Sequence, residues 1–238
     1  MHMRIGILIV GSLLWDENQN RQKWRRNRLA IDAKRSVPAP IRYGRRSQSR
    51  GCSYTMVFSS ELVGDESRLG TAACVPCLHG VNSLEDLVVE AECLWAAERN
   101  KAATNGQIGA NWGSVSLLVN PESGQSKAIR EMWTERVSAE KHYKLPRPAT
   151  GEQSIVDDQG LLSMTWPRVL DNTTEGLDAI LATATDPTLS DGGYPSAEEI
   201  AKAWMTATGQ KYVEYFHKNR ESQIETFQDR EIIKRLPQ

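Results

Sequence analysis

The feature that most constrains the fold is a short apolar run, Ile5 to Val10, which leads directly into Gly11 and Ser12. A continuous apolar run of this length predicts a buried strand and is too short to cross a bilayer. Glycine after a strand lets the chain turn sharply and present successive N–H groups to one point. Ser12 adds a hydroxyl, and Leu13 and Leu14 are typical of a pocket wall. An ordinary strand-ending turn is the alternative.

A second constraint is an amphipathic helix predicted from Leu84 to Arg99. Ser83 is a suitable N-cap with Asp86 in the reciprocal capping position. On a 3.6-residue period one face is apolar, and it consists of Leu84, Leu87, Val88, Ala91, Leu94 and Trp95. Glu98 follows in the same stripe, which predicts a carboxylate on the core side of the helix.

A carboxylate on a buried face must be paired, hydrogen-bonded or protonated, and a raised pKa suits proton transfer near neutral pH. Glu98 is therefore a candidate acid/base group. The alternatives are that it reaches solvent from the helix end or forms a structural ion pair. Glu90 and Glu92 lie off the stripe, where solvated carboxylates are expected.

Four segments in this order resemble the gamma-glutamylcyclotransferase-like family, closest to its glutathione-acting branch, over roughly residues 4–120. They are Gly11-Ser12-Leu13 after the first strand, Tyr43-Gly44-Arg45-Arg46-Ser47 with Ser49-Arg50-Gly51, Leu69-Gly70-Thr71-Ala72 with Val75-Pro76, and the helix with its late Glu98. The resemblance implies a curled mixed sheet or barrel around a small-molecule pocket.

The resemblance also implies an activity. In that family the loop binds the γ-glutamyl end of the substrate, and one Glu moves protons while the substrate's α-amine attacks its γ-carbonyl. The products are 5-oxoproline and a free amine, and no cofactor or metal is needed. Carried over, Gly11, Ser12, Leu13 and Leu14 bind substrate and Glu98 is catalytic, with Arg50 as a second contact to the substrate anion.

Two alternatives to this lyase or transferase activity stay open. Val10 stands where the family has an aromatic residue, and valine neither stacks nor donates a hydrogen bond. A non-catalytic small-ligand binding module of the same fold is the first alternative. The second is a zinc or redox protein that uses Cys74 and Cys77, near His79. Buried small residues are the expected role of these cysteines.

Composition narrows the function classes. The formal net charge of the 238 residues is −1, but arginines and lysines are concentrated between Arg21 and Arg50. This stretch has no nucleic-acid motif and few aromatics, so a solvated face or a funnel for an anionic substrate is expected, with no nucleic-acid or membrane partner. Four cysteines and no convincing targeting signal predict a soluble, cytoplasmic chain.

The turn-forming residues that separate the apolar segments of the chain predict an α+β fold. Strands are expected near residues 4–10, 36–43, 53–59, 70–76 and 113–119, and a helix from Pro121 to Tyr143. The loop Lys101 to Gly113 is expected to be a plain connector, and the alternative is that it acts as a lid or carries Trp112 over the site. These elements form a predicted core over residues 1–150.

Residues 151–238 are expected to be a mainly helical extension, either packed on the core as part of the same domain or separate from it. It should contain a strand near 161–166, a short helix over 177–184, a helix capped by Ser196, and a final helix. Tyr212, Tyr215 and Phe216 on the final helix predict packing, with homo-oligomer contacts through these helices as the alternative.

Overall fold

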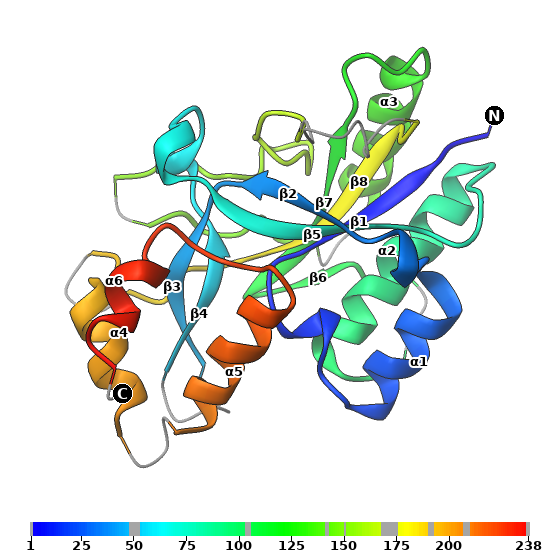
Figure 1. Ribbon diagram of the computed structural model, residues 1–238. Coiled ribbons are helices and arrows are strands. Elements are labelled where there is room, and N and C mark those ends of the chain that lie inside the picture. The colour runs from blue at the N-terminus through cyan, green and yellow to red at the C-terminus, as the bar shows by residue number, and fades with distance from the viewer. Residues whose placement is uncertain are drawn as a thin grey trace.

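A six-stranded mixed sheet with the order β2-β5-β1-β8-β7-β6 lies at the centre of the molecule (Figure 1). The computed structural model describes residues 2–47, 53–102, 106–140, 143–149, 151–167, 176–189, 193–206 and 210–236. In sheet order the strands are Arg35–Ala39, Gly70–Pro76, Ile5–Ile9, Ala179–Thr185, Gly113–Val119 and Gly109–Ala110. The predicted α+β class with a mixed sheet is confirmed.

The first strand, β1, lies inside this sheet and all five of its residues are buried. It runs antiparallel to β5, with Ile9 opposite Ala73, and parallel to β8, with Ile5 opposite Ala179. A strand with a neighbour on each side and cover on both faces favours the continuous apolar run seen in the sequence. The carboxyl end of β1 is consequently held in the middle of the fold.

The predicted strand over 36–43 is two strands. β2 pairs with β5, but after Pro40 the chain leaves that partner, and β3 (Ile41–Ser47) pairs with β4 (Ser53–Phe58) as a separate two-stranded sheet. Proline has no N–H to donate, which makes it a natural break in a ladder. Because β3 leaves the sheet and β6 has two residues, the described strands do not close into the expected barrel.

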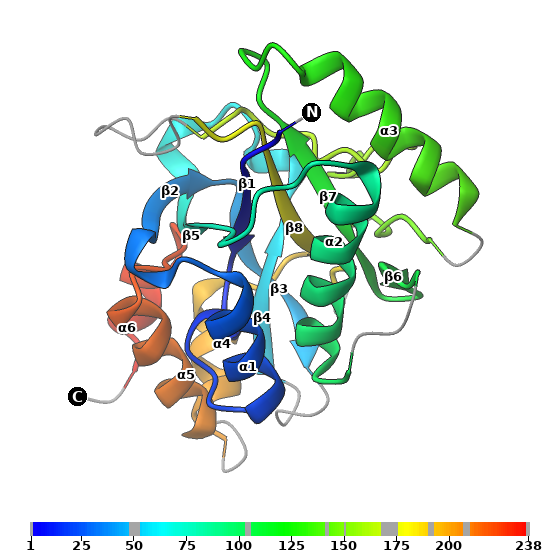
Figure 2. The ribbon, with the colours of Figure 1, turned by 90° about the vertical axis from the view of Figure 1, so that its right-hand side faces the viewer.

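Helix α2 (Leu84–Arg99) has the predicted bounds. The Ser83 hydroxyl caps it by accepting a hydrogen bond from Asp86 N (3.1 Å), and Asn100 ends it in the left-handed conformation (φ 54°). The reciprocal bond differs from the expected one, because the Asp86 carboxylate accepts from Asn82 N (2.9 Å). The helix lies beside α1 (Gln19–Arg28), as Figure 2 shows.

The expectation that Glu90 is solvated is wrong. Glu90 is 2% exposed, and the guanidinium of Arg28 on α1 donates to both of its carboxylate oxygens, at 2.5 and 3.1 Å. Burial raises the pKa of Glu90, and the neighbouring Arg28 opposes the rise. The phase of α2 alone could not reveal this pair, because α1 covers the flank of α2 on which Glu90 lies.

The expected helix over 177–184 is also wrong, since Ala179–Thr185 form strand β8 in the middle of the sheet. β8 pairs with β1 on one side and with β7 on the other, so its apolar residues are buried on both faces. A short apolar run without charges fits a buried strand as well as a helix. The region 151–238 therefore contributes a central strand in addition to its helices.

Two smaller elements differ from expectation. Helix α3 spans Ser126–Ala139 only, because residues 120–124 form a turn in which Ser123 N donates to Asn120 O (3.2 Å). The expected strand over 161–166 is reduced to isolated bridges at Leu161 and Leu162. There the chain turns back, as Ser163 N donates to Ile155 O (2.7 Å).

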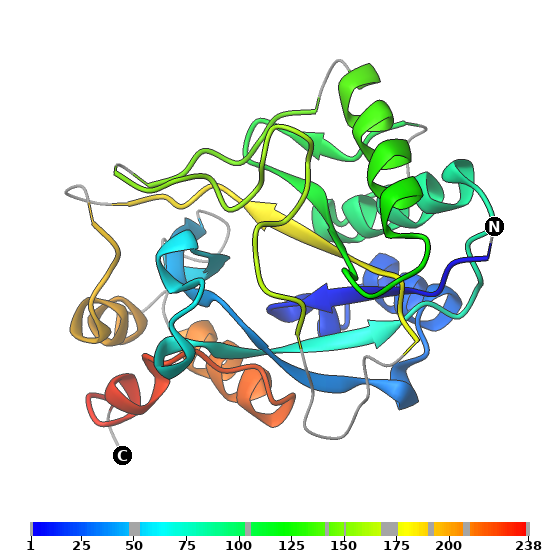
Figure 3. The same cartoon turned by 90° about the horizontal axis from the view of Figure 1, so that it is seen from above.

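The C-terminal helices α4 (Ala197–Trp204), α5 (Gln210–Glu221) and α6 (Asp229–Ile233) gather at the end of the molecule opposite α3 (Figure 3). The predicted Ser196 cap of α4 is present as a full capping box with Glu199. Trp204 is fully buried between Tyr43 and Phe216, with ring centroids 5.4 and 5.0 Å away.

Of the aromatic residues expected to pack on the final helix, Tyr215 and Phe216 are buried, whereas the side chain of Tyr212 lies outside the described part. Homo-oligomer contacts through these helices stay a prediction, as does a cytoplasmic location. No helix within the described ranges has both the length and the apolar character needed to cross a membrane.

Asp229, at the start of α6, is a buried carboxyl group whose titration should affect stability. It is 2% exposed, and its Oδ2 makes no hydrogen bond to the described residues, while its Oδ1 accepts from the Thr226 hydroxyl (2.6 Å). Burial raises the pKa of Asp229 to about 6 from 3.8. The folded chain thus holds a proton that the unfolded chain has released between these two pH values.

Asp229→Asn should therefore stabilise the protein at pH 8 by up to about 3 kcal/mol and leave it almost unchanged at pH 3.5. The stability contribution of protonated Asp229 is full below its ordinary pKa and is lost as pH rises through about 6. Urea unfolding at the two pH values measures the difference, with the exposed Asp32→Asn as the matched control. A gain that is the same at both pH values would contradict the argument.

Candidate functional site

A tight turn follows β1 and forms one wall of the candidate site. The chain passes through Gly11 into a single 3-10 turn, Ser12–Leu14, closed by bonds from Leu14 N to Gly11 O (3.3 Å) and from Asp16 N to Ser12 O (2.8 Å). Arg25 of α1 fixes the turn by donating to Leu13 O (2.7 Å) and Asp16 O (2.6 Å). Arg25 thus holds the loop through two of the loop's backbone carbonyl groups.

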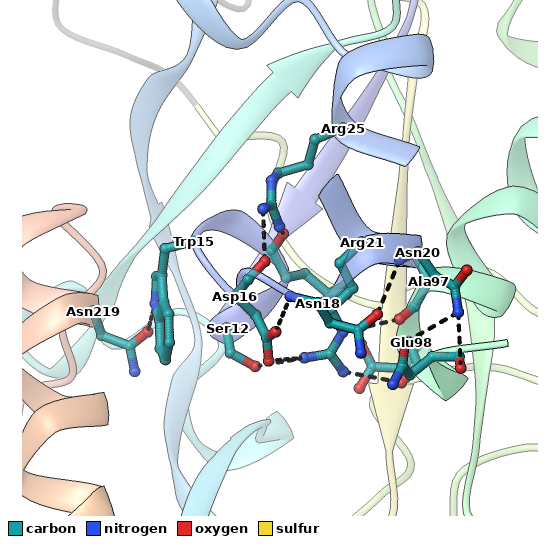
Figure 4. A network of polar contacts seen from close by, with 12 residues as sticks. Ser12, Trp15, Asp16, Asn18, Asn20, Arg21, Arg25, Ala97, Glu98 and Asn219 are labelled. Atoms are coloured by element: carbon teal, nitrogen blue, oxygen red, sulfur yellow. Dashed lines mark hydrogen bonds and ion pairs between the residues drawn. The ribbon is translucent and has the colours of Figure 1, made fainter. Parts of the chain in front are cut away.

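Arg21 of α1 joins this turn to the end of α2 (Figure 4). Its guanidinium donates to Ser12 Oγ (3.2 Å) and Asp16 Oδ2 (2.7 Å) on one side. On the other side it donates to the carbonyl oxygens of Ala97 (3.1 Å) and Glu98 (3.2 Å). A cation at the C-terminal end of a helix also stabilises the helix dipole. One side chain therefore sets the position of the loop relative to the backbone of Glu98.

A cavity of about 230 Å³ lies where the turn, the end of α2 and the strands β1, β3, β4 and β8 meet. Ser12 and Glu98, 86 residues apart in the chain, both line it. Its full lining is Leu8, Ile9, Val10, Gly11, Ser12, Leu13, Arg21, Arg45, Ser47, Thr55, Met56, Val57, Glu98, Trp112, Thr183, Thr185 and Tyr215. Sequence order separates these residues, and the fold brings them around one space.

The lining carries both signs of charge beside an aromatic wall. Arg21 and Arg45 contribute positive charge and Glu98 a carboxylate. The Arg45 guanidinium lies over the ring of Trp112, 4.4 Å from its centroid, and Trp112 stacks on Trp95 at 4.7 Å. Cation–π and stacking contacts hold such side chains in place. The cavity is thus suited to a small polar ligand that carries both an anionic and a cationic group.

Strand β8 adds a polar group to the floor of the cavity. The Oγ1 of Thr183 is buried and makes no hydrogen bond to any described residue, and Thr185 two residues later also lines the space. Buried hydroxyl groups in proteins nearly always have a partner. An unpartnered hydroxyl at a cavity wall is consistent with a polar ligand there.

The structure brings most of the predicted site residues together. Gly11, Ser12, Leu13 and Glu98 all line the cavity. Leu14 does not line it, and its half-buried side chain packs on the hydrophobic core. Arg50 lies outside the described residues.

Sequence reasoning assigned no individual role to the other polar residues of the cavity. Arg21 and Arg45 belong to the basic stretch for which a funnel was one expectation, but nothing in the sequence singles them out from its other arginines. Trp112 does line the cavity, which is the alternative to a plain connector that placed Trp112 over the site. Tyr215 was expected to pack, and it reaches the cavity only because β8 carries the C-terminal region back to the sheet.

The cysteines offer little support for a zinc or redox site. Burial raises the pKa of Cys74 to about 12 and that of Cys77 well above its usual range, whereas metal-binding and redox cysteines need a stabilised thiolate. Within the described ranges no cluster of three or more His, Cys, Asp or Glu side chains could hold a metal ion. The exposed His79 bonds to Asn27 O at 3.3 Å.

Comparison of the chain with protein-family models, with curated proteins and with solved structures finds no match.

Arg21→Lys should loosen the loop and lower the free energy of unfolding by about 1–3 kcal/mol. A lysine ammonium cannot span the four acceptors that the planar guanidinium reaches on the loop and on α2. Urea unfolding measures the loss. Arg26→Lys, at an exposed position of the same helix, is the matched control and should stay within about 0.5 kcal/mol of wild type. Equal effects would mean that Arg21 fixes nothing.

Proposed function

We propose that the protein is a gamma-glutamylcyclotransferase-like enzyme that cyclises a γ-glutamyl, or related, amide to 5-oxoproline and releases an amine. The observation that carries this proposal is the shared cavity of the Gly11–Leu13 turn and Glu98. The mixed sheet, with the turn after β1 and α2 ahead of β7, is compatible with a gamma-glutamylcyclotransferase-like fold, which is part of the same proposal.

The charges of the cavity fit the head group of such a substrate. A γ-glutamyl compound carries an α-carboxylate and an α-ammonium on neighbouring atoms. Arg21 and the Ser12 hydroxyl supply donors for the carboxylate, and Glu98 supplies the counter-charge for the ammonium. The volume of about 230 Å³ is just below the range of about 300–1,000 Å³ usual for larger ligands, which suits a small head group.

In the proposed reaction Glu98 transfers two protons, one after the other, from the attacking nitrogen to the leaving nitrogen. Its carboxylate first takes a proton from the α-ammonium, and the resulting amine attacks the γ-carbonyl carbon to close a five-membered ring. The protonated Glu98 then gives this proton to the leaving nitrogen as its bond to the γ-carbon breaks. The ring nitrogen sheds a second proton as it becomes the lactam N–H, and the Glu98 carboxylate passes that proton to the released amine, which leaves as an ammonium. Nucleophile and electrophile belong to one molecule, so the cavity needs only to hold the bent conformation.

The atoms and electrons of the proposed reaction balance. One C–N bond forms and another breaks, the two protons lost by the α-ammonium leave on the released amine, and no atom changes its oxidation state. The proposal therefore requires no cofactor or co-reactant. Positive charge from Arg21 and Arg45 near the reacting carbonyl would stabilise the oxyanion that forms during attack.

A non-catalytic binding module is the second candidate, and one observation favours it. Val10 lines the cavity at the position before the glycine, and its aliphatic side chain offers neither stacking nor a hydrogen bond. A cavity without that group can still bind a γ-glutamyl ligand while it orients the ligand poorly for ring closure. The two candidates differ in turnover, not in binding.

The test is to incubate the protein with γ-glutamyl dipeptides, glutathione and other amide metabolites and to detect 5-oxoproline and released amine by mass spectrometry. The matched control is a γ-glutamyl dipeptide whose α-amine is acetylated, because that nitrogen cannot attack. Cyclisation predicts product from the free dipeptide only. Amine release from both compounds would indicate hydrolysis, and a thermal shift without product would favour the binding module.

A further inference from the structure

The hydroxyl of Tyr215 lies against the turn that follows β1, although the two are some 200 residues apart. A Cβ built on Gly11 would lie 2.7 Å from Tyr215 Oη, closer than real Cβ atoms come to any neighbour. The backbone of Gly11 is extended (φ 178°), so glycine is not needed there for its conformation. What the position requires is room for the tyrosine hydroxyl.

Contacts within the fold hold this ring in place. Tyr215 is 5% exposed, and Trp15 packs edge-on against it with ring centroids 5.4 Å apart. The indole N–H of Trp15 donates to Asn219 Oδ1 (2.7 Å), one turn further along α5 (Figure 4). The turn after β1 and helix α5 are thereby tied together, and Tyr215 lines the cavity beside Gly11 and Ser12.

We propose that Tyr215 is a ligand-binding residue of this cavity, whose hydroxyl donates a hydrogen bond to a carboxylate group held at the Gly11–Leu13 turn. The C-terminal region then has a role at the site, since its final long helix supplies part of the carboxylate pocket. The identity of the ligand rests on the proposed function. In that reaction the carboxylate group is the α-carboxylate of the substrate.

The surroundings favour an anionic oxygen as the acceptor. Arg21 and Arg45 line the same cavity, and the Ser12 hydroxyl lies beside the glycine that Tyr215 touches. A phenolic O–H can donate to a carboxylate but brings no charge of its own, so it adds direction to the attraction that the arginines provide. Removing only the hydroxyl should therefore weaken binding without loss of the aromatic packing.

The placement of the hydroxyl can be tested without a ligand. Gly11→Ala should lower the melting temperature of the wild type by about 3–10 °C, because the new methyl group meets Tyr215 Oη. In a Tyr215→Phe background the same change should cost less than about 2 °C, since the nearest remaining ring atom is 3.8 Å away. Equal losses in both backgrounds would overturn the placement.

The ligand role is tested by calorimetry with a γ-glutamyl dipeptide at up to millimolar concentration. Tyr215→Phe should weaken its binding by about 10- to 100-fold, the usual effect of a hydrogen bond to a charged group. The same dipeptide with its α-carboxylate amidated should bind wild type and variant equally. Tyr143→Phe removes a hydroxyl that bonds to Val115 O instead, and it should leave binding unchanged.

The outcomes separate this inference from the proposed function. Turnover of the dipeptide with equal binding by wild type and Tyr215→Phe overturns the role of Tyr215 alone. Tyr215-dependent binding without 5-oxoproline supports that role and overturns the cyclisation alone. Failure of the wild type to bind any carboxylate-bearing dipeptide overturns both.

Discussion

Glu98→Gln should lower the rate of 5-oxoproline formation by about 10²–10⁴-fold while ligand binding and fold stay close to wild type. The amide keeps the size and shape of the side chain but can neither accept the ammonium proton nor return it to the leaving amine. Glu98 is in the last turn of α2, where Arg21 holds the backbone carbonyl, so the change leaves the anchoring contacts of the helix in place. Initial rates over a range of substrate concentrations measure the effect.

The matched control for this variant lies on the same helix. Glu85→Gln changes an exposed carboxylate in the first turn of α2, whereas Glu98 is in the last turn. This change should leave the rate unchanged. A loss confined to kcat in Glu98→Gln is the expected pattern, because the substrate head group still has its other contacts. Turnover equal to that of wild type would mean that another group moves the proton.

Helix phase and the turn after the first strand were sufficient to predict the two halves of the candidate site. The apolar run ending in Gly11 and the stripe of α2 that ends in Glu98 are both local patterns, and local patterns survive in the fold. Their meeting around one cavity depends on α2 packing over the strands, which an apolar stripe facing the core implies.

Local sequence patterns could not predict which strands pair when they lie far apart in the chain. Strand β8 gains its structure from β1 and β7, on either side, and its own seven residues carry no pattern that distinguishes a buried strand from a helix. Because β8 was not predicted as a strand, the return of the C-terminal region to the sheet was not predicted either. Tyr215 and Thr183 could therefore not be placed at the site.

Glu90 shows the same limit on the surface of a correctly predicted helix. Its phase on α2 places it beside the apolar stripe, where solvent is the usual neighbour. Helix α1 covers that flank and brings Arg28 to within 2.5 Å of the carboxylate. Whether a charge at the border of a stripe is solvated or paired depends on the next element, and that information is not local.

Arg28→Met should lower the free energy of unfolding by about 3–5 kcal/mol at pH 8, the range found when one partner of a buried pair is removed. Glu90, which is 2% exposed in the wild type, loses both of its hydrogen bonds to the guanidinium. Urea unfolding measures the loss. The double variant Arg28→Met/Glu90→Leu removes the stranded charge as well, and it should recover most of the stability.

The loss in Arg28→Met should shrink as the pH falls, and the sign follows from the pKa of Glu90. Burial already raises this pKa above its ordinary value of 4.5, and Arg28 is the group that lowers it. Without Arg28 the folded-state pKa rises further, so folding favours the protonated carboxyl. That contribution is full below pH 4.5 and is lost as pH rises through the folded-state value, which makes the deficit at pH 5 smaller than at pH 8. A deficit independent of pH would mean that lost packing of the Arg28 stem, not the stranded charge, destabilises the variant.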